Sequence, residues 1–160
     1  MNKIQSNDVF SLLNPAFCSI IVYDFIKNYE SEKSKGCFLP LVYTVLPIVM
    51  SSDINKTLNR KTISYGLNTW LVDNPEVLID IDKKITSSKK ITEEAVVFAL
   101  NSGILGIDNN GKITTNKDIP KNKLNKNVEL KKYIKYSRLL GSWYREMDDS
   151  QILYSLGVIL

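Results

Sequence analysis

The sequence predicts a mainly α-helical fold with one small β-hairpin, and the clearest signals lie in residues 91–115. Residues 95–100 place apolar side chains along one face of a helix. The dipeptide Asn110-Gly111 then lies between two short apolar runs, which is the strongest short signal for a hairpin. A helix that leads directly into a two-stranded hairpin is typical of a winged-helix domain. We therefore expect one winged-helix-like domain over residues 1–160, with an additional C-terminal helix.

The N-terminal region, residues 14–60, is predicted to be helical. Asn14 is a good N-cap residue, and Pro15 suits the first position of the helix that follows. Residues 38–50 carry no charge, so they form either a buried helix bent at Pro47 or a fully buried strand. We favour the helix, because proline within a central strand would remove a ladder hydrogen bond.

Residues 64–116 are predicted to form the winged-helix-like unit, with three helices followed by the hairpin. The first helix precedes Asn74 and the second begins just after it. Thr92 is expected to cap the third helix. This placement would put the Glu93 and Glu94 carboxylates in its first turn, where the helix dipole is positive.

A glycine and two changes in composition predict the remaining boundaries between elements. Gly103 is expected to end the third helix in the left-handed conformation. Residues 117–127 are rich in lysine and asparagine and are predicted to form a loop that buries little. Residues 128–160 are predicted to form the C-terminal helices, with Asp148 and Asp149 at the cap of the last one.

The positive charge is concentrated after the hairpin. The whole chain has a formal net charge of +4, whereas residues 112–135 hold eight lysines against Asp118 and Glu129. This pattern has two interpretations, a solvated surface loop or a track for DNA phosphates. The helix before the hairpin is a poor reader of bases, because Glu93 and Glu94 would meet the phosphates. Under the DNA hypothesis the contacting lysines are Lys112, Lys117, Lys121, Lys123 and Lys126.

Most residue sets that support catalysis are missing from the sequence. It contains no histidine, which removes the commonest metal ligand and the usual general base near neutral pH. Two separated cysteines without histidine do not make the usual zinc site. We expect no catalytic residue, no cofactor and no metal; a small enzyme that uses Cys37 is kept only as a remote hypothesis. The uncharged run at residues 36–52 is too short for a membrane span, which favours a soluble cytoplasmic protein.

Aromatic and aliphatic side chains suggest a partner surface or a core. The first helix is apolar over most of its circumference, and Trp143 and Tyr144 lie late in the last long helix. A domain of this size leaves some apolar faces uncovered, and such patches mark interfaces. The partner-binding hypothesis therefore names Phe17, Ile21, Phe25, Leu140, Trp143 and Tyr144, and the alternative places them in the core.

Several motifs follow one another along the chain in a characteristic order. They are Asn14-Pro15-Ala16-Phe17, Leu39-Pro40-Leu41, Leu46-Pro47-Ile48-Val49-Met50, Ile91-Thr92-Glu93-Glu94-Ala95, Gly103-Ile104-Leu105, Leu139-Leu140-Gly141-Ser142-Trp143-Tyr144 and Leu156-Gly157-Val158. In this order the chain resembles the middle component of bacterial three-component ABC-ATPase systems, which include the Lamassu anti-phage systems.

The resemblance implies a non-enzymatic adaptor. Such a subunit would join an SMC-type ABC ATPase to an effector-bearing third subunit in an anti-phage or anti-plasmid defence complex. It implies no catalytic residue, and any DNA contact would be made within the complex. The alternative function is a stand-alone DNA-binding winged-helix regulator.

Overall fold

The computed structural model describes residues 14–31, 36–120 and 127–159 of the chain. Its helices are α2 Pro15–Tyr29, α3 Leu39–Met50, α4 Ser52–Asn55, α5 Leu67–Asp73, α6 Ile81–Asn101, α8 Val128–Arg145 and α9 Asp149–Ser155. The 3₁₀ turns are η1 Lys56–Leu58, η2 Ile63–Tyr65 and η3 Pro75–Leu78, and the strands are β1 Leu105–Ile107 and β2 Ile113–Thr115. The prediction of a mainly helical fold with one small hairpin is confirmed.

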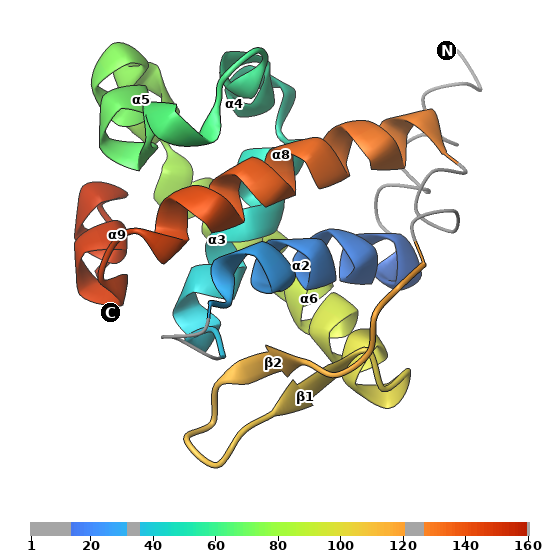
Figure 1. Cartoon of the computed structure of the whole chain (residues 1–160). Helices are drawn as coiled ribbons and strands as arrows, with labels where there is room; N and C mark the ends of the chain where they lie inside the picture. The colour runs from blue at the N-terminus through green and yellow to red at the C-terminus, as the bar shows by residue number, and fades with distance from the viewer. Residues whose placement is uncertain (1–13, 32–35, 121–126, 160) are drawn as a thin grey trace.

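The two helices at the centre of the fold, α2 and α8, run side by side in the same direction (Figure 1). α2 begins as predicted, with Pro15 in its first turn and the Asn14 side chain accepting a hydrogen bond from the Ala16 amide at 2.8 Å. Gly141 allows the close approach of α8, because a Cβ atom there would lie 2.5 Å from the Phe25 carbonyl oxygen. The pair therefore depends on a glycine at the crossing.

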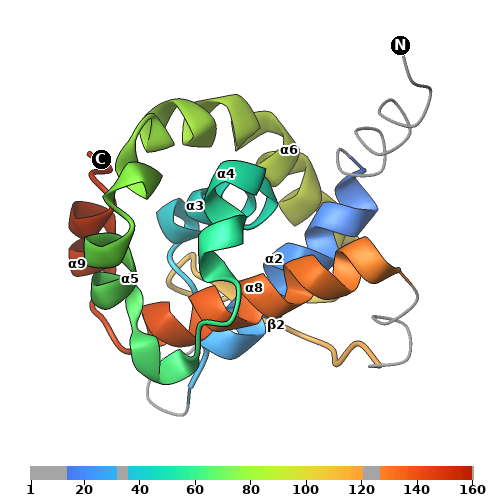
Figure 2. The ribbon, with the colours of Figure 1, turned by 90° about the horizontal axis from the view of Figure 1, so that it is seen from above.

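α3 is the predicted helix, with Pro47 inside it, and most of its side chains are buried. Its Thr44 hydroxyl lies 2.8 Å from the Tyr144 hydroxyl of α8. Viewed from above, α5 and α6 curve around α3 and α4 (Figure 2). The uncharged run at residues 38–50 is therefore a buried central helix.

The prediction of two separate helices between residues 76 and 102 is wrong, because α6 is continuous from Ile81 to Asn101. Thr92 does not cap a helix; its hydroxyl donates to the Ser88 carbonyl at 2.9 Å. The hydroxyls of Thr86, Ser87 and Ser88 donate to carbonyls of the preceding helical turn, which keeps these residues compatible with a helix interior. Glu93 and Glu94 consequently lie in mid-helix, and the Glu93 carboxylate accepts from the Tyr43 hydroxyl at 2.9 Å.

The helix predicted to begin just after Asn74 begins later, at Ile81. Directly after Asn74 the chain makes only the 3₁₀ turn η3, and no side-chain cap forms. The Asn74 amide instead donates to the Trp70 carbonyl at 2.9 Å, so it closes the end of α5.

The predicted hairpin is confirmed. β1 and β2 are antiparallel, with Leu105 opposite Thr115, and Gly103 and Gly111 both have positive φ. Cys37 adds a one-residue bridge, since its amide donates to the Ile113 carbonyl at 2.7 Å and its carbonyl accepts from the Ile113 amide at 2.9 Å. The hairpin is thus attached to the chain just before α3.

The predicted winged-helix-like unit, residues 64–116, does not pack as a self-contained unit. α6 packs mainly against α2 and α3, which precede this range. The Trp70 ring of α5 lies 5.6 Å from the Trp143 ring of α8. The helix-to-hairpin connection is therefore present, but its supporting helices come from elsewhere in the chain.

The start of the predicted lysine- and asparagine-rich loop, residues 117–127, is held against α2. Lys27 forms an ion pair with Asp118 at 2.9 Å, and the Ile119 amide donates to the Tyr23 hydroxyl at 3.2 Å. Residues 121–126 lie outside the described residues.

None of the helices in residues 14–31, 36–120 and 127–159 combines the length and apolar character that a membrane span requires.

Candidate functional site: a cationic groove along α8

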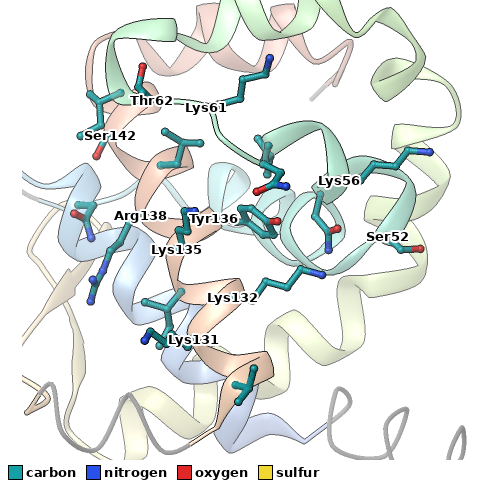
Figure 3. A pocket seen from close by; sticks show the side chains of 18 residues that line it. Ser52, Lys56, Lys61, Thr62, Lys131, Lys132, Lys135, Tyr136, Arg138 and Ser142 are labelled. Atoms are coloured by element: carbon teal, nitrogen blue, oxygen red, sulfur yellow. The ribbon is translucent and has the colours of Figure 1, made fainter.

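A groove of about 1090 Å³ lies between α8 and the segment that runs from α4 to η2 (Figure 3). Its lining is strongly cationic and contains no carboxylate among the residues that the structure describes. The cationic side chains are Lys56, Lys61, Lys131, Lys132, Lys135 and Arg138. Neutral polar side chains, including Ser52, Asn59, Thr62 and Ser142, complete much of the remaining surface.

The α8 wall follows from helical spacing. Lys131, Lys135, Arg138 and Ser142 are separated by four, three and four residues, so they form one stripe along the helix. Asn127 is the N-cap of this helix, and its side chain accepts a hydrogen bond from the Glu129 amide at 2.9 Å. The cationic stripe therefore lies on a long, capped helix.

The facing wall is held by buried polar contacts. The Asn55 amide donates to the Val49 carbonyl at 2.9 Å, and the Trp70 indole donates to the Thr57 hydroxyl at 2.9 Å. The Trp143 indole of α8 donates to the Thr62 carbonyl at 3.0 Å, which ties the two walls together. The groove is therefore preorganised by the fold.

Arg138 differs from the five lysines because its charge is compensated. Its guanidinium lies 2.9 Å from the Asp24 carboxylate, whose side chain is only 3% exposed. Burial raises the pKa of Asp24, and the hydrogen bond and charge of Arg138 oppose that rise. Among described residues no carboxylate pairs with Lys56, Lys61, Lys131, Lys132 or Lys135. The groove thus carries five uncompensated positive charges.

Tyr136 lies between the two walls, with its hydroxyl directed away from α8 (Figure 3). The residue is only 5% exposed, but its hydroxyl is open to solvent and makes no hydrogen bond to any described residue. A solvent-accessible hydroxyl that lines a cationic groove is available to a ligand acceptor.

The ion pair of Arg138 predicts a pH-dependent stability change. The folded-state pKa of Asp24 is raised, so ionised Asp24 disfavours folding, and Arg138→Ala would raise that pKa further. The variant should lose about 1–3 kcal/mol near pH 7, less than for a fully buried pair, because Arg138 is half exposed. The loss should shrink as pH falls toward about 4 and Asp24 takes up a proton. Denaturant unfolding at both pH values measures this, and a loss independent of pH would contradict the assignment.

The structure places five of the six proposed partner-binding side chains inside the chain. Their exposed fractions are Ile21 0%, Phe25 0%, Leu140 0%, Trp143 1% and Tyr144 0%. Phe17 is partly buried, and its ring meets the Tyr133 ring edge-on at 6.2 Å. The expected exposed aromatic patch is therefore corrected: these side chains join α2, α3 and α8 in the core.

The proposed DNA-contacting lysines do not line the groove. Lys112 is half-buried on the hairpin, where it packs against Gly36. The Lys117 ammonium lies near Gly103, at the carboxyl end of α6, where a positive charge complements the helix dipole. In Figure 1 the hairpin and α4 lie on opposite sides of the α2–α8 pair. Lys121, Lys123 and Lys126 fall outside the described residues.

Both cysteines are buried. Burial raises the pKa of Cys18 to about 12 and also raises the pKa of Cys37, so both are held as thiols. Cys37 is fully buried rather than exposed in a loop, which corrects the expectation that it is accessible for reaction. Within the described part of the chain, no three His, Cys, Asp or Glu side chains gather as a potential metal site.

The sequence contained part of the signal for the groove. The stripe of Lys131, Lys135 and Arg138 is visible at helical spacing, although the hypothesis placed the contacts earlier in the lysine run. Lys56 and Lys61 carried no such signal, because they are about 70 residues away and meet α8 only in the fold.

The fold and the groove together define a small helical protein with one preorganised cationic surface. Residues 3–160 match the family model of the ABC-three component (ABC-3C) system Middle Component 3, and the chain belongs to this family. It is therefore a component of an ABC-three component system, whose other components are its partner subunits. No curated protein and no solved structure matches the chain.

Proposed function

We propose that this chain is a non-enzymatic adaptor that joins an SMC-like ABC ATPase to an effector-bearing third subunit. The complex would be a Lamassu-like bacterial system acting against phages or plasmids in the cytoplasm. The observation that carries the proposal is the extent of the family match, because residues 3–160 include the whole described fold. The described structure is thus that of a middle component throughout.

The arrangement of the core supports a scaffolding role. α2, α3 and α8 share one interior, and Gly141, Tyr144 and Thr44 fix how the three helices cross. A rigid interior keeps separate surfaces at fixed positions, which is what a subunit that bridges two partners requires. The two tryptophans attach the α4–η2 segment to the same interior.

The stand-alone winged-helix regulator has one observation in its favour, the direct passage from α6 into the hairpin. Its usual DNA-reading helix would be α6, the helix before the wing. α6 presents Glu93 and Glu94 in its middle, and Glu93 is engaged by Tyr43 and Lys89. The adaptor therefore remains the stronger proposal.

Affinity purification of the complete system tests the proposal. The tagged chain is expressed together with the ABC ATPase and the third component encoded with it. Both should copurify with the tag, and ATPase, nuclease and protease activity of the chain alone should stay at background. A chain that purifies without either partner, or turnover that follows the pure chain through every column, would overturn the proposal.

A further inference from the structure

We propose that the cationic groove between α8 and the α4–η2 segment binds a run of backbone phosphates of a nucleic acid. This inference goes beyond the adaptor role and does not depend on it. It also places the nucleic-acid contact on the opposite side of the fold from the hairpin lysines.

The positive charge of the groove favours a polyanionic ligand. Five lysines line the groove without a carboxylate partner in the described part of the chain, and the sixth cation, Arg138, is already paired with Asp24. Lysine is a point charge that contacts phosphate without reading bases, so the expected contact is sequence-independent. Binding of this kind releases counterions and weakens steeply with salt.

The type of cation argues against an acidic protein segment as the occupant. Lysine is strongly hydrated and is depleted at the centre of protein–protein interfaces, where arginine and aromatic side chains dominate. Here the aromatic anchors Trp70 and Trp143 are fully buried beneath the wall rather than offered to a partner. Phosphates and sugars, in contrast, accept contacts from lysine and from neutral groups such as those of Ser52 and Thr62.

The shape of the groove fits a chain of phosphates better than a compact ligand. Its volume of about 1090 Å³ lies at the upper limit of small-molecule sites. From Lys131 to Arg138 the α8 stripe extends roughly 10 Å along the helix axis. That length corresponds to about three steps of one nucleic-acid strand. Lys56 and Lys61 belong to the other wall, so both walls of the groove carry cations.

Tyr136 adds a hydrogen-bond donor to the lining of the groove. Most of its side chain is buried between the walls, and its hydroxyl, which bonds to none of the described residues, is open to solvent. A phosphate oxygen in the groove would accept from this hydroxyl. The groove therefore offers a hydroxyl donor as well as the lysine ammonium groups.

Fluorescence anisotropy of the full chain with labelled DNA tests the proposal. The probes are a single strand and a duplex of the same sequence, titrated between about 50 mM and about 200 mM salt. The groove variant is Lys131→Gln/Lys132→Gln/Lys135→Gln. Its matched control, Lys83→Gln/Lys89→Gln/Lys90→Gln, removes the same three charges from exposed positions of α6. Thermal melts establish that both variants keep the wild-type fold.

The groove variant should lose at least tenfold in affinity, and its salt slope for the duplex should fall by roughly 3 × 0.9. The control should lose less than threefold. Adding Lys56→Gln/Lys61→Gln should weaken binding further, and Tyr136→Phe should weaken it severalfold without changing charge. Either order of single-strand and duplex affinities supports the proposal and identifies which form lies in the groove.

Four results would overturn the proposal. The first is that the wild-type chain does not bind DNA at low salt, and the second is that the groove and control variants lose equal DNA affinity. The third is that only Lys112→Gln/Lys117→Gln loses DNA affinity. The fourth is that the wild-type chain binds polyglutamate through the groove but does not bind DNA. The last result would assign the groove to an acidic polypeptide. None of these results bears on the adaptor role, which the copurification decides separately.

Discussion

Replacing Gly141 with alanine is expected to lower the free energy of unfolding by about 2 kcal/mol or more. The added Cβ would lie 2.5 Å from the Phe25 carbonyl oxygen and 3.2 Å from the Tyr29 amide nitrogen. Both atoms belong to the α2 backbone, so α2 and α8 must separate to accommodate the methyl group. Alanine also favours the helix over glycine by about 1 kcal/mol, but this gain is smaller than the cost of the clash.

Chemical denaturation of wild type and Gly141→Ala measures the effect, with Lys132→Ala as the control in the same helix. Lys132 is exposed, so the control should stay within about 0.5 kcal/mol of the wild type. A more stable Gly141→Ala variant would mean that helix propensity outweighs packing, and that the two helices do not meet as closely as described.

Replacing Tyr144 with alanine is expected to cost about 3–5 kcal/mol. The Tyr144 side chain is fully buried, its ring meets the Phe25 ring at 5.4 Å, and its hydroxyl lies 2.8 Å from the Thr44 hydroxyl. For a chain of this size the melting temperature should fall by about 2–4 °C for each kcal/mol. Tyr154→Ala is the matched control, since Tyr154 is 87% exposed and its loss should change the melting temperature little.

The Tyr144 variant also separates a core role from a partner surface. A core residue lowers the melting temperature of the free chain, whereas a surface residue leaves it unchanged and weakens only partner binding. An unchanged melting temperature together with loss of a partner would contradict the core assignment.

Local signals in the sequence predicted local structure well. Asn14-Pro15 begins α2, Asn110-Gly111 turns the hairpin, and the uncharged run containing Pro47 is buried in α3. Each depends on the conformational preference of one or two residues, which tertiary packing does not override here.

Two features of the structure could not be predicted without knowledge of the tertiary contacts. Thr92 satisfies the rule for an N-cap and also bonds within a helix interior, so the sequence did not distinguish a helix start from the middle of α6. The apolar circumference of α2 suggested an uncovered face, but α6 and α8 both pack against it. The number of neighbours around a helix is a tertiary property that periodicity does not report.

For the same reason, only the α8 wall of the groove could be recognised in the sequence. The α8 stripe is a local pattern, but its significance comes from the α4–η2 segment that lies opposite. Charge counted along the sequence gave most weight to the lysines around residues 112–126. Of these, Lys112 and Lys117 lie at the hairpin and at the end of α6.

Size-exclusion chromatography with light scattering shows directly whether this chain joins the other two components. The purified ABC ATPase and third component are mixed with and without the chain. The adaptor role predicts one complex that holds all three proteins, and no association of the other two when the chain is omitted. If the ATPase and the third component form the same complex at the same concentrations without this chain, the chain does not bridge them and the adaptor role is contradicted.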